Sequence, residues 1–321
     1  MKYHLLCLTI DTDPDGLNAL HPDRGNLEFR GLAAMPEFRA ELDARRAQFG
    51  GEPVPVTWFI RADGQLRRAF GDALYLVRRY EKLWQEVLVA RDELAWHPHL
   101  YRSGGSDGTE ILTDPVEAAE ELERTWTELT ASSFFAPKAF RNGEGWHTRQ
   151  TLAKVEQLGF AVDSTAIPGR TGPAGHPMDW IGAPNQPYYP DPADIRRSVP
   201  RRGILELPMS TWRFQASYDR APKVRYIDPA VHEELFASGL EDWERYVASS
   251  RADLLVWIMV FHPGEVLPRP GGDLLFAHSR EAVYRNVREL IERIHVRGDS
   301  FEFTTVSAAA ERWRAHREES L

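Results

Sequence analysis

The chain has 321 residues but a single cysteine, Cys7, which excludes a disulfide within the chain. Cys7 lies inside an apolar run, so we expect a buried, small hydrophobic side chain rather than a nucleophile. The chain also lacks an excess of positive charge: 39 Lys and Arg stand against 48 Asp and Glu, a net charge of −9. This balance argues against nucleic acid or an anionic membrane surface as the main partner.

Long hydrophobic runs and a nucleotide-binding signature are also missing. The apolar run LLVWIMVF at 254–261 is too short to span a bilayer and predicts a buried strand. No glycine-rich phosphate loop follows the first strand-like run, which removes the usual sequence argument for a nucleotide-binding fold. The N-terminal apolar stretch is interrupted by His4 and lacks a small-residue cleavage site, so we expect no signal peptide and a cytoplasmic protein.

Strand-like and helix-like segments alternate along the chain. The expected strands are residues 4–10, 54–60, 92–97, 137–141, 160–163, 203–207, 254–261 and 301–305, and the expected helices are 35–48, 65–90, 114–131, 148–158, 229–250, 279–297 and 307–318. Short connections indicate βα units and a mostly parallel sheet. This α/β pattern predicts one distorted (β/α) barrel domain of about seven strands over residues 1–321. A doubly wound open sheet is the alternative.

One long segment breaks the alternation. Residues 167–203 are rich in proline and glycine and contain three aromatic residues, Trp180, Tyr188 and Tyr189. So long a segment without regular structure is usually a functional loop in a compact domain. We therefore expect a loop insertion that covers the C-terminal face of the barrel and sets substrate specificity.

Five of the strand-like runs end in a polar group that could take part in chemistry. These groups are Asp11 and Asp13, His97 and His99, Arg141, Asp163, and His262. The carboxyl ends of parallel strands meet at one edge of a barrel, where active sites are built. The strand ends are therefore predicted to form one site, and this set of residue types suits metal-assisted hydrolysis.

Each pair of polar residues also has a suitable spacing. Asp11 and Asp13 are two residues apart, so an extended chain turns both toward the same side, where one could bind a metal and the other act as a base. His97 and His99 share this spacing, and neutral imidazole is a common zinc ligand. Packing of one histidine beside a tryptophan is the alternative.

Arg141, His262 and Asp163 are expected to complete the site that these two pairs of residues form. Arg141 would orient Asp11 and stabilise its carboxylate, although a surface arginine at a turn is the alternative. A carboxylate beside His262 would keep its imidazole protonated and suited to act as a general acid. Asp163 is the candidate for that carboxylate.

Other aromatic and histidine residues give weaker indications. Trp58, Trp96, Trp146, Trp180 and Trp212 fall near strand ends or in the long loop, where they could face a sugar ring or pack in the core. The remaining histidines, including those at positions 147 and 176, have no converging context. Ordinary surface or core positions are expected for them.

Taken in order, the segments LTIDTD, DELAWHPH, FRNGEGW, FAVDST and VFHPGE resemble the motifs of the polysaccharide deacetylase family, the NodB-like carbohydrate esterases. The resemblance extends over most of the chain. It implies a distorted (β/α) barrel that removes acetyl groups from sugars with a bound divalent metal. It also implies a base at Asp11, metal ligands at Asp13 and His97, an arginine beside the base at Arg141, and a general acid at His262.

Two positions depart from the family pattern. The second histidine ligand is usually four residues after the first, where this chain has Tyr101, so His99 is expected to replace it. The first motif is Asp-x-Asp rather than two adjacent aspartates. Both features are similar to divergent branches that are linked to surface-sugar or metabolite biosynthesis.

The expected function is therefore a metal-dependent hydrolase that removes an acyl group, N-acetyl in the first place, from a sugar or sugar-containing metabolite. Zinc is the expected metal, with cobalt or nickel as alternatives. A deformylase or other small-amide hydrolase of the same fold is a second reading. A barrel that binds glycans without turnover is a third, although a binder needs neither a base nor an acid.

Overall fold

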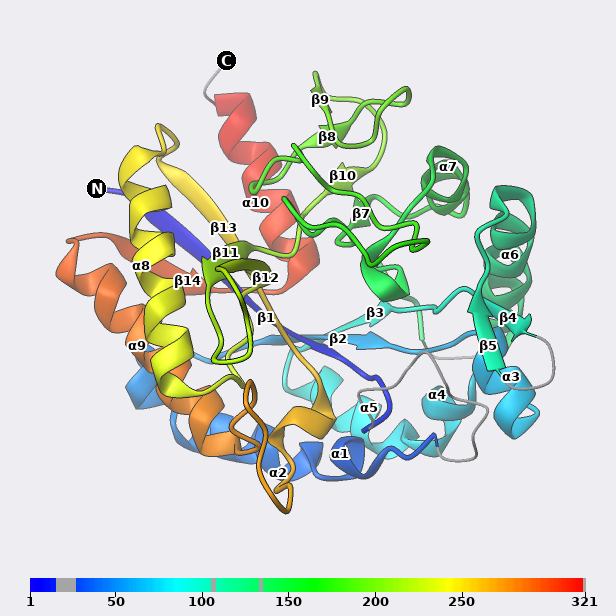
Figure 1. Ribbon diagram of the computed structural model, residues 1–321, viewed down its shortest axis with the longest axis horizontal. Helices are drawn as coiled ribbons and strands as arrows, with labels where there is room; N and C mark the ends of the chain where they lie inside the picture. The colour runs from blue at the N-terminus through cyan, green and yellow to red at the C-terminus, as the bar shows by residue number, and fades with distance from the viewer. Residues whose placement is uncertain (16–26, 105–107, 133–134, 320–321) are drawn as a thin grey trace.

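The computed structural model describes residues 1–15, 27–104, 108–132 and 135–319 (Figure 1). Its strands are β1 (Tyr3–Asp11), β2 (Val56–Ile60), β3 (Glu93–Trp96), β4 (Tyr101–Gly104), β5 (Gly108–Ile111), β6 (Ala139–Phe140), β7 (Val162–Asp163), β8 (Tyr189–Pro190), β9 (Ser198–Val199), β10 (Leu205–Glu206), β11 (Thr211–Phe214), β12 (Lys223–Tyr226), β13 (Leu254–Phe261) and β14 (Ser300–Phe303). Its α-helices are α1 (Arg30–Ala33), α2 (Met35–Ala44), α3 (Gly64–Phe70), α4 (Tyr75–Arg79), α5 (Glu81–Val89), α6 (Pro115–Ser132), α7 (Arg149–Gln157), α8 (Glu233–Ser249), α9 (Arg280–Val296) and α10 (Val306–Glu319). Three short 3₁₀ turns lie at Arg46–Phe49, Gly143–Gly145 and Pro263–Val266.

The main sheet confirms the predicted α/β barrel. Seven strands follow one another in the order β10-β7-β6-β3-β2-β1-β13, and β14 pairs with the first half of β1. Every pair in this sheet is parallel. The sheet curls into an incomplete barrel with helices along its outside; α8 and α9 lie at one side and α6 and α7 at the other (Figure 1). The carboxyl ends of these strands therefore meet at one edge.

The gap between the two ends of the curled sheet is bridged by loop backbone. Ser210 N donates to Ile258 O in β13 at 3.1 Å, and Val260 N of the same strand donates to Ile227 O at 2.9 Å. These bonds satisfy backbone groups of β13 that no neighbouring strand pairs. The barrel is thus closed by the segments before β11 and after β12 rather than by an eighth consecutive strand.

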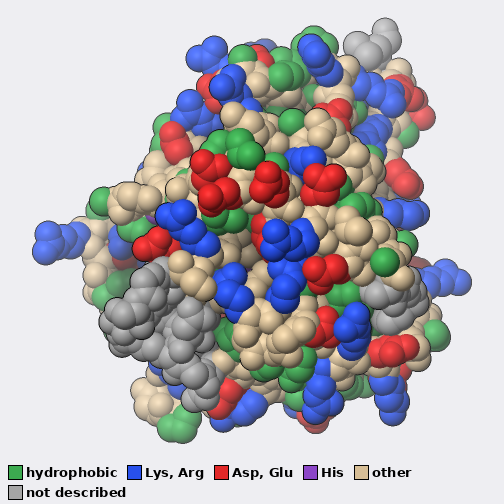
Figure 2. Space-filling view, turned by 90° about the vertical axis from the view of Figure 1, so that its right-hand side faces the viewer, with side chains coloured by type: hydrophobic (Ala, Val, Ile, Leu, Met, Phe, Trp, Pro, Cys, Tyr) green, Lys and Arg blue, Asp and Glu red, His purple; other side chains and the backbone are tan. Residues whose placement is uncertain are grey.

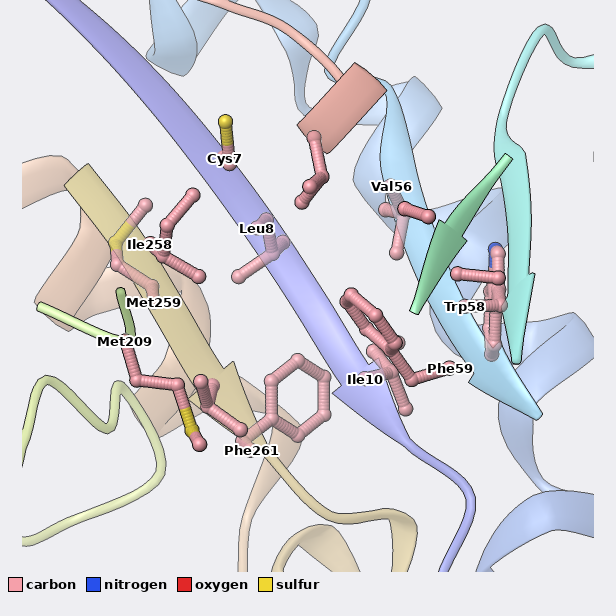
Figure 3. Close-up of a cluster of buried hydrophobic side chains, with 14 of the residues drawn as sticks. Cys7, Leu8, Ile10, Val56, Trp58, Phe59, Met209, Ile258, Met259 and Phe261 are labelled. Carbon is pink, nitrogen blue, oxygen red and sulfur yellow. The ribbon is translucent and has the colours of Figure 1, made fainter. Parts of the chain in front are cut away.

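Continuous apolar runs in the central strands form the core. Side chains from β1, β2 and β13 pack together with Met209 in one cluster (Figure 3). Cys7 belongs to this cluster and is fully buried, and burial raises the pKa of its thiol well above the usual value, as expected for an inert hydrophobic residue. The five tryptophans considered for a sugar site are also buried, so they act in packing.

The expected helix over 65–90 is divided into three. Asp63 caps α3 by accepting hydrogen bonds from Gln65 N and Leu66 N. Gly71 ends that helix with φ of 74°, a left-handed conformation that favours glycine. The chain then starts again in α4 and α5, so a glycine inside a periodic pattern marked a real helix end.

The long loop does not cover the site over its whole length. Its first part, including Ile167 and Met178, lines the cavity at the strand ends. The later part forms the short β8–β9 hairpin, where Tyr189 contacts Trp313 of α10 with ring centroids 6.0 Å apart. Only the first third of this segment is therefore placed to contact a substrate at the strand ends.

Over the part of the chain that the structure describes, no helix combines the length and apolar character that a bilayer span requires. One face of the molecule shows basic and acidic side chains interspersed (Figure 2). The cytoplasmic location expected from the sequence stays a prediction.

Candidate active site

Strand register brings the predicted residues together. Ile10 of β1 pairs with Phe261 of β13, which places Asp11 and His262 at the same level. Trp96 of β3 pairs with Phe140 of β6, so the residues that follow them, His97 and Arg141, are also level. Six of the seven predicted site residues, all except Asp163, line one cavity of about 240 Å³ at this edge.

Arg141 is fully buried and holds Asp11. Its Nη1 donates to Asp11 Oδ1 at 2.5 Å and to Thr9 Oγ1 at 3.0 Å. Its Nε and Nη2 donate to the carbonyl and hydroxyl oxygens of Ser164 at 2.9 and 3.0 Å. The guanidinium also lies 3.8 Å from the centre of the Phe59 ring. Because several donors are fixed in one plane, Arg141 sets the orientation of the Asp11 carboxylate.

Asp13, His97 and His99 form a candidate metal centre. One ligand atom from each lies within 4.8 Å of the other two. His97 Nδ1–H donates to Arg141 O at 2.9 Å, so its Nε2 is free to bind a cation. His99 Nε2 lies 3.2 Å from His97 Nε2 and 3.0 Å from Asp13 Oδ1. One carboxylate and two imidazoles match the ligand types of a catalytic zinc site.

The partly buried carboxylate of Asp13 also fits a role in binding a cation. Its Oδ1 is inaccessible to solvent and accepts no hydrogen bond of normal geometry from the described residues. Burial alone would raise the pKa of Asp13, but the neighbouring His99 and His97 lower the pKa well below its usual value. These neighbours favour the ionised carboxylate, the form that can bind a cation, and Asp13 Oδ1 lies 3.8 Å from His97 Nε2 and 3.0 Å from His99 Nε2.

Polar residues around His99 hold its ring in place. Tyr101 OH lies 3.4 Å from His99 Nδ1 and donates a hydrogen bond to Glu144. Gly143 lies against the other side, where an added Cβ would come within 2.3 Å of the imidazole. Tyr101, which stands where the family resemblance would put the second histidine, thus helps to hold the ring of His99.

His262 has a carboxylate partner, but it is Glu265 and not Asp163. Glu265 Oε1 accepts a hydrogen bond from His262 Nδ1 at 2.9 Å, and Oε2 accepts one from His262 N at 2.7 Å. Burial lowers the pKa of His262, but the Glu265 carboxylate more than offsets this, and the net pKa is well above the usual value. The direction of this shift agrees with the protonated imidazole expected from the sequence, but the carboxylate beside His262 is Glu265 and not the predicted Asp163.

The alternation of side chains between the two faces of a strand explains why Asp163 was the wrong partner for His262. Asp163 pairs with Phe140, whereas the level of Arg141 is reached one residue later, at Ser164. Successive side chains point to opposite faces, so Asp163 faces away from the cavity. There its Oδ2 lies 3.2 Å from His147 Nε2. His147, expected to have an ordinary position, is thus part of a buried charged cluster.

The buried side chain of Glu206 lies beside Asp163, and this contact leads to a stability prediction. Both carboxyl groups are buried; burial first, and the nearby Asp163 second, raise the pKa of Glu206 well above its usual value. One Glu206 oxygen accepts from Ala166 N at 2.9 Å, and its side chain is hydrogen-bonded to Asp163. A glutamine at this position could keep the contacts with Ala166 N and Asp163, and it has no carboxyl proton that could be released.

We therefore expect Glu206→Gln to stabilise the protein at alkaline pH. Above the unfolded pKa of about 4.5 the unfolded chain releases this proton and the native protein retains it, so the free energy of unfolding falls as pH rises toward the native pKa. The variant should lack this slope and exceed wild type by about 1–3 kcal/mol at pH 8, with little difference at pH 4.5. Urea unfolding at both pH values measures this. The exposed Glu311→Gln is the control, and equal pH slopes in wild type and Glu206→Gln would contradict the raised pKa of Glu206.

Sequence reasoning missed several residues of the site. Arg61 follows β2 and is fully buried, with Nη1 3.5 Å from Asp13 Oδ1. It ends a strand as the predicted residues do, so the same signal could have found it. Glu144 and Glu265 lie inside two of the quoted motifs. His176, whose Nε2 lies 3.7 Å from Glu144 Oε2, comes from the long loop and had no sequence signal.

Comparisons with known proteins agree with this architecture. No family model matches the sequence, and no curated protein matches it. A solved Mycobacterium smegmatis protein, assigned provisionally as a polysaccharide deacetylase, is 19% identical with a TM-score of 0.54, over 98% of this chain and 92% of that one. The fold implied by the family resemblance is therefore confirmed.

Two more distant structures carry no argument of their own. The peptidoglycan deacetylase PdaC from Bacillus subtilis is 12% identical, with a TM-score of 0.38 over 98% of this chain and 94% of that one. A family 4 carbohydrate esterase from Streptomyces lividans, solved with acetate, is 10% identical, with a TM-score of 0.38 over 96% and 95% of the two chains. At these identities the likeness concerns the fold alone, and activity must be argued from the site.

Proposed function

We propose that this protein is a metal-dependent deacylase of the polysaccharide deacetylase family, acting on an N-acetylated sugar or a metabolite that contains one. The observation that carries the proposal is the arrangement at the strand ends. The carboxylate of Asp11, held by an arginine, lies near His97 of the Asp13–His97–His99 group, and His262 lies near Asp13. A base, an acid and a candidate metal centre in one cavity suit hydrolysis of an amide or ester.

Asp13, His97 and His99 would hold the metal, for which we propose zinc, with cobalt or nickel as alternatives. When bound, a divalent metal supplies Lewis acidity toward the acyl carbonyl and lowers the pKa of the attacking water. Because the imidazoles must be unprotonated to bind it, metal affinity should weaken as pH falls.

The residues of the chain provide the proton transfers. Arg141 occupies Asp11 Oδ1, so Asp11 Oδ2, which lies 3.8 Å from His97 Nε2, is the oxygen placed to take a proton from the attacking water. Glu265 occupies His262 Nδ1, which leaves Nε2, 3.6 Å from Asp13 Oδ2, to donate a proton to the leaving nitrogen. Acid and base thus face the same cavity from β13 and β1.

Release of acetate or formate from a panel of acylated sugars tests the proposal. Full-length protein is assayed after chelation and after zinc, cobalt or nickel is added back, with His262→Ala as the acid-deficient variant. We expect metal-dependent acetate release that falls by about 10²- to 10⁴-fold in His262→Ala. Formate release instead would favour a deformylase. No release from any substrate, with metal bound, would refute the proposal and favour a non-catalytic glycan binder.

A further inference from the structure

A second, larger cavity adjoins the one at the strand ends. It encloses about 790 Å³, against about 240 Å³ for the cavity at the metal centre. Five residues line both cavities: Asp13, Glu144, Arg170, Tyr226 and His262. A molecule whose acyl group reaches His262 would therefore extend into the larger cavity, where the rest of the substrate is recognised.

Most charges in the larger cavity are already neutralised. Arg30 pairs with Glu28 at 3.0 Å, and Arg269 pairs with Asp273 at 3.2 Å. These two cations therefore have carboxylate partners within the protein.

Apart from Asp13, which belongs to the candidate metal centre, the carboxylates of the larger cavity also have hydrogen-bond donors. Asp15 accepts hydrogen bonds from Arg30 N at 2.6 Å and Gly31 N at 2.8 Å. Glu265 accepts from His262, and Glu144 from Tyr101. An anion entering the cavity would thus meet carboxylates that already have donors.

Arg170 is the exception among these charges. Its side chain is half-buried and lines both cavities, yet no carboxylate among the described residues lies within ion-pairing distance of it. Its guanidinium instead lies 5.9 Å from the centre of the Tyr226 ring. A charge that is partly removed from water and unpaired is costly, so such a position is most easily explained by a ligand that supplies the partner.

The backbone around Arg170 is fixed in place. Arg170 N donates to Ile167 O at 3.1 Å, and Trp180 N donates to Arg170 O at 2.8 Å. The Trp180 indole in turn donates to Gly145 O at 2.6 Å, which ties this part of the loop to the edge of the metal site. The cation is thereby held at a set distance from the reacting group, and less side-chain and loop freedom is lost on binding.

We propose that the substrate carries a phosphate or a carboxylate on its sugar, and that Arg170 binds this anionic group in the larger cavity. The inference rests on the proposed deacylation at the neighbouring site. Guanidinium binds both anions through two parallel hydrogen bonds. The natural substrate is therefore an acidic acylated sugar, such as a sugar phosphate or a sugar acid, and a neutral polysaccharide would leave Arg170 unpaired.

Binding of deacylated sugars tests the inference without turnover. The probes are glucosamine 1-phosphate, glucosamine 6-phosphate, muramic acid and methyl glucosaminide, the control that lacks an anionic group. Each is titrated calorimetrically into zinc-loaded full-length protein. All four carry the same amine, so they differ in the anionic group. We expect at least one anionic probe to bind about 10- to 100-fold more tightly than methyl glucosaminide. A preference for either sugar phosphate indicates a phosphate, and a preference for muramic acid indicates a carboxylate.

Variants assign the preference to Arg170. Arg170→Gln should reduce it to about threefold or less, Arg170→Lys should retain part of it, and the exposed Arg288→Gln on α9 should retain all of it. Equal binding of all four probes by wild type would overturn the inference, and so would a preference that survives in Arg170→Gln. Anion-selective binding without acyl release from any substrate would refute the proposed function and not this site. Acyl release together with equal binding of all four probes would support the proposed function and refute the anion site at Arg170.

Discussion

Replacing Asp11 by asparagine is expected to lower kcat by about 10²- to 10⁴-fold while the metal content stays that of wild type. The amide keeps the size of the carboxylate and can still accept a hydrogen bond from Arg141, but it cannot take a proton from water. Steady-state rates on the best substrate of the panel, with elemental analysis of the same samples, measure both quantities.

Asp13→Asn is the matched comparison. The two aspartates are two residues apart and share one cavity, yet Asp13 belongs to the metal group and Asp11 is held by Arg141. We expect the Asp13 variant to lose metal and turnover together. If Asp11→Asn kept near-normal turnover, or if it lost the metal, its assignment as the base would be wrong.

Replacing Arg141 by methionine is expected to reduce the free energy of unfolding by about 3–5 kcal/mol, because one partner of a buried ion pair is removed. The side chain is fully buried, and its loss would leave Asp11, Thr9 and Ser164 without their shared donor. Methionine fills much of the same volume, so the lost charge and hydrogen bonds would dominate the effect. Urea unfolding of the metal-free proteins measures it.

Two other variants separate charge from geometry. Arg141→Lys keeps the positive charge, but one ammonium group cannot reach all of these acceptors, so an intermediate loss is expected. The exposed Arg288→Met should change stability by less than about 0.5 kcal/mol. A loss below about 1 kcal/mol in Arg141→Met would show that the cluster around Arg141 does not depend on its charge.

The sequence predicts the barrel well because its strands are buried on both faces. Continuous apolar runs such as 254–261 leave little doubt about where strands lie, and the predicted strands all correspond to strands of the main sheet. A strand that stops at a polar residue also marks the edge of the sheet where the candidate site lies. That rule brought Asp11, His97, Arg141 and His262 together correctly.

The rule that strands end at site residues fails where the register of a strand decides which side chain faces the cavity. Asp163 and Ser164 both end β7, and only pairing with Phe140 shows that the serine reaches Arg141. A one-residue shift in a strand turns a side chain to the opposite face, and no composition or motif reveals it. The motif that contains Asp163 therefore indicated the right strand and the wrong residue.

Contacts made by turns and loops are the second kind of feature that the sequence does not predict. Glu265 reaches His262 because a 3₁₀ turn at Pro263–Val266 brings the chain back by three residues. Arg170 and His176 reach the cavity through loop geometry that has no periodic signal. Such residues become visible only when the turn itself is known, which is why the substrate class could not be read from the sequence.

Metal content measured by elemental analysis tests the central claim most directly. Wild type, His97→Ala, His99→Ala and the exposed control His295→Ala would be incubated with zinc, cobalt or nickel and freed of unbound metal. We predict about one ion per chain in wild type and in the control, and loss from both of the other variants. Wild type that retains none of the three metals, or variants that both keep a full equivalent, would contradict the Asp13–His97–His99 centre.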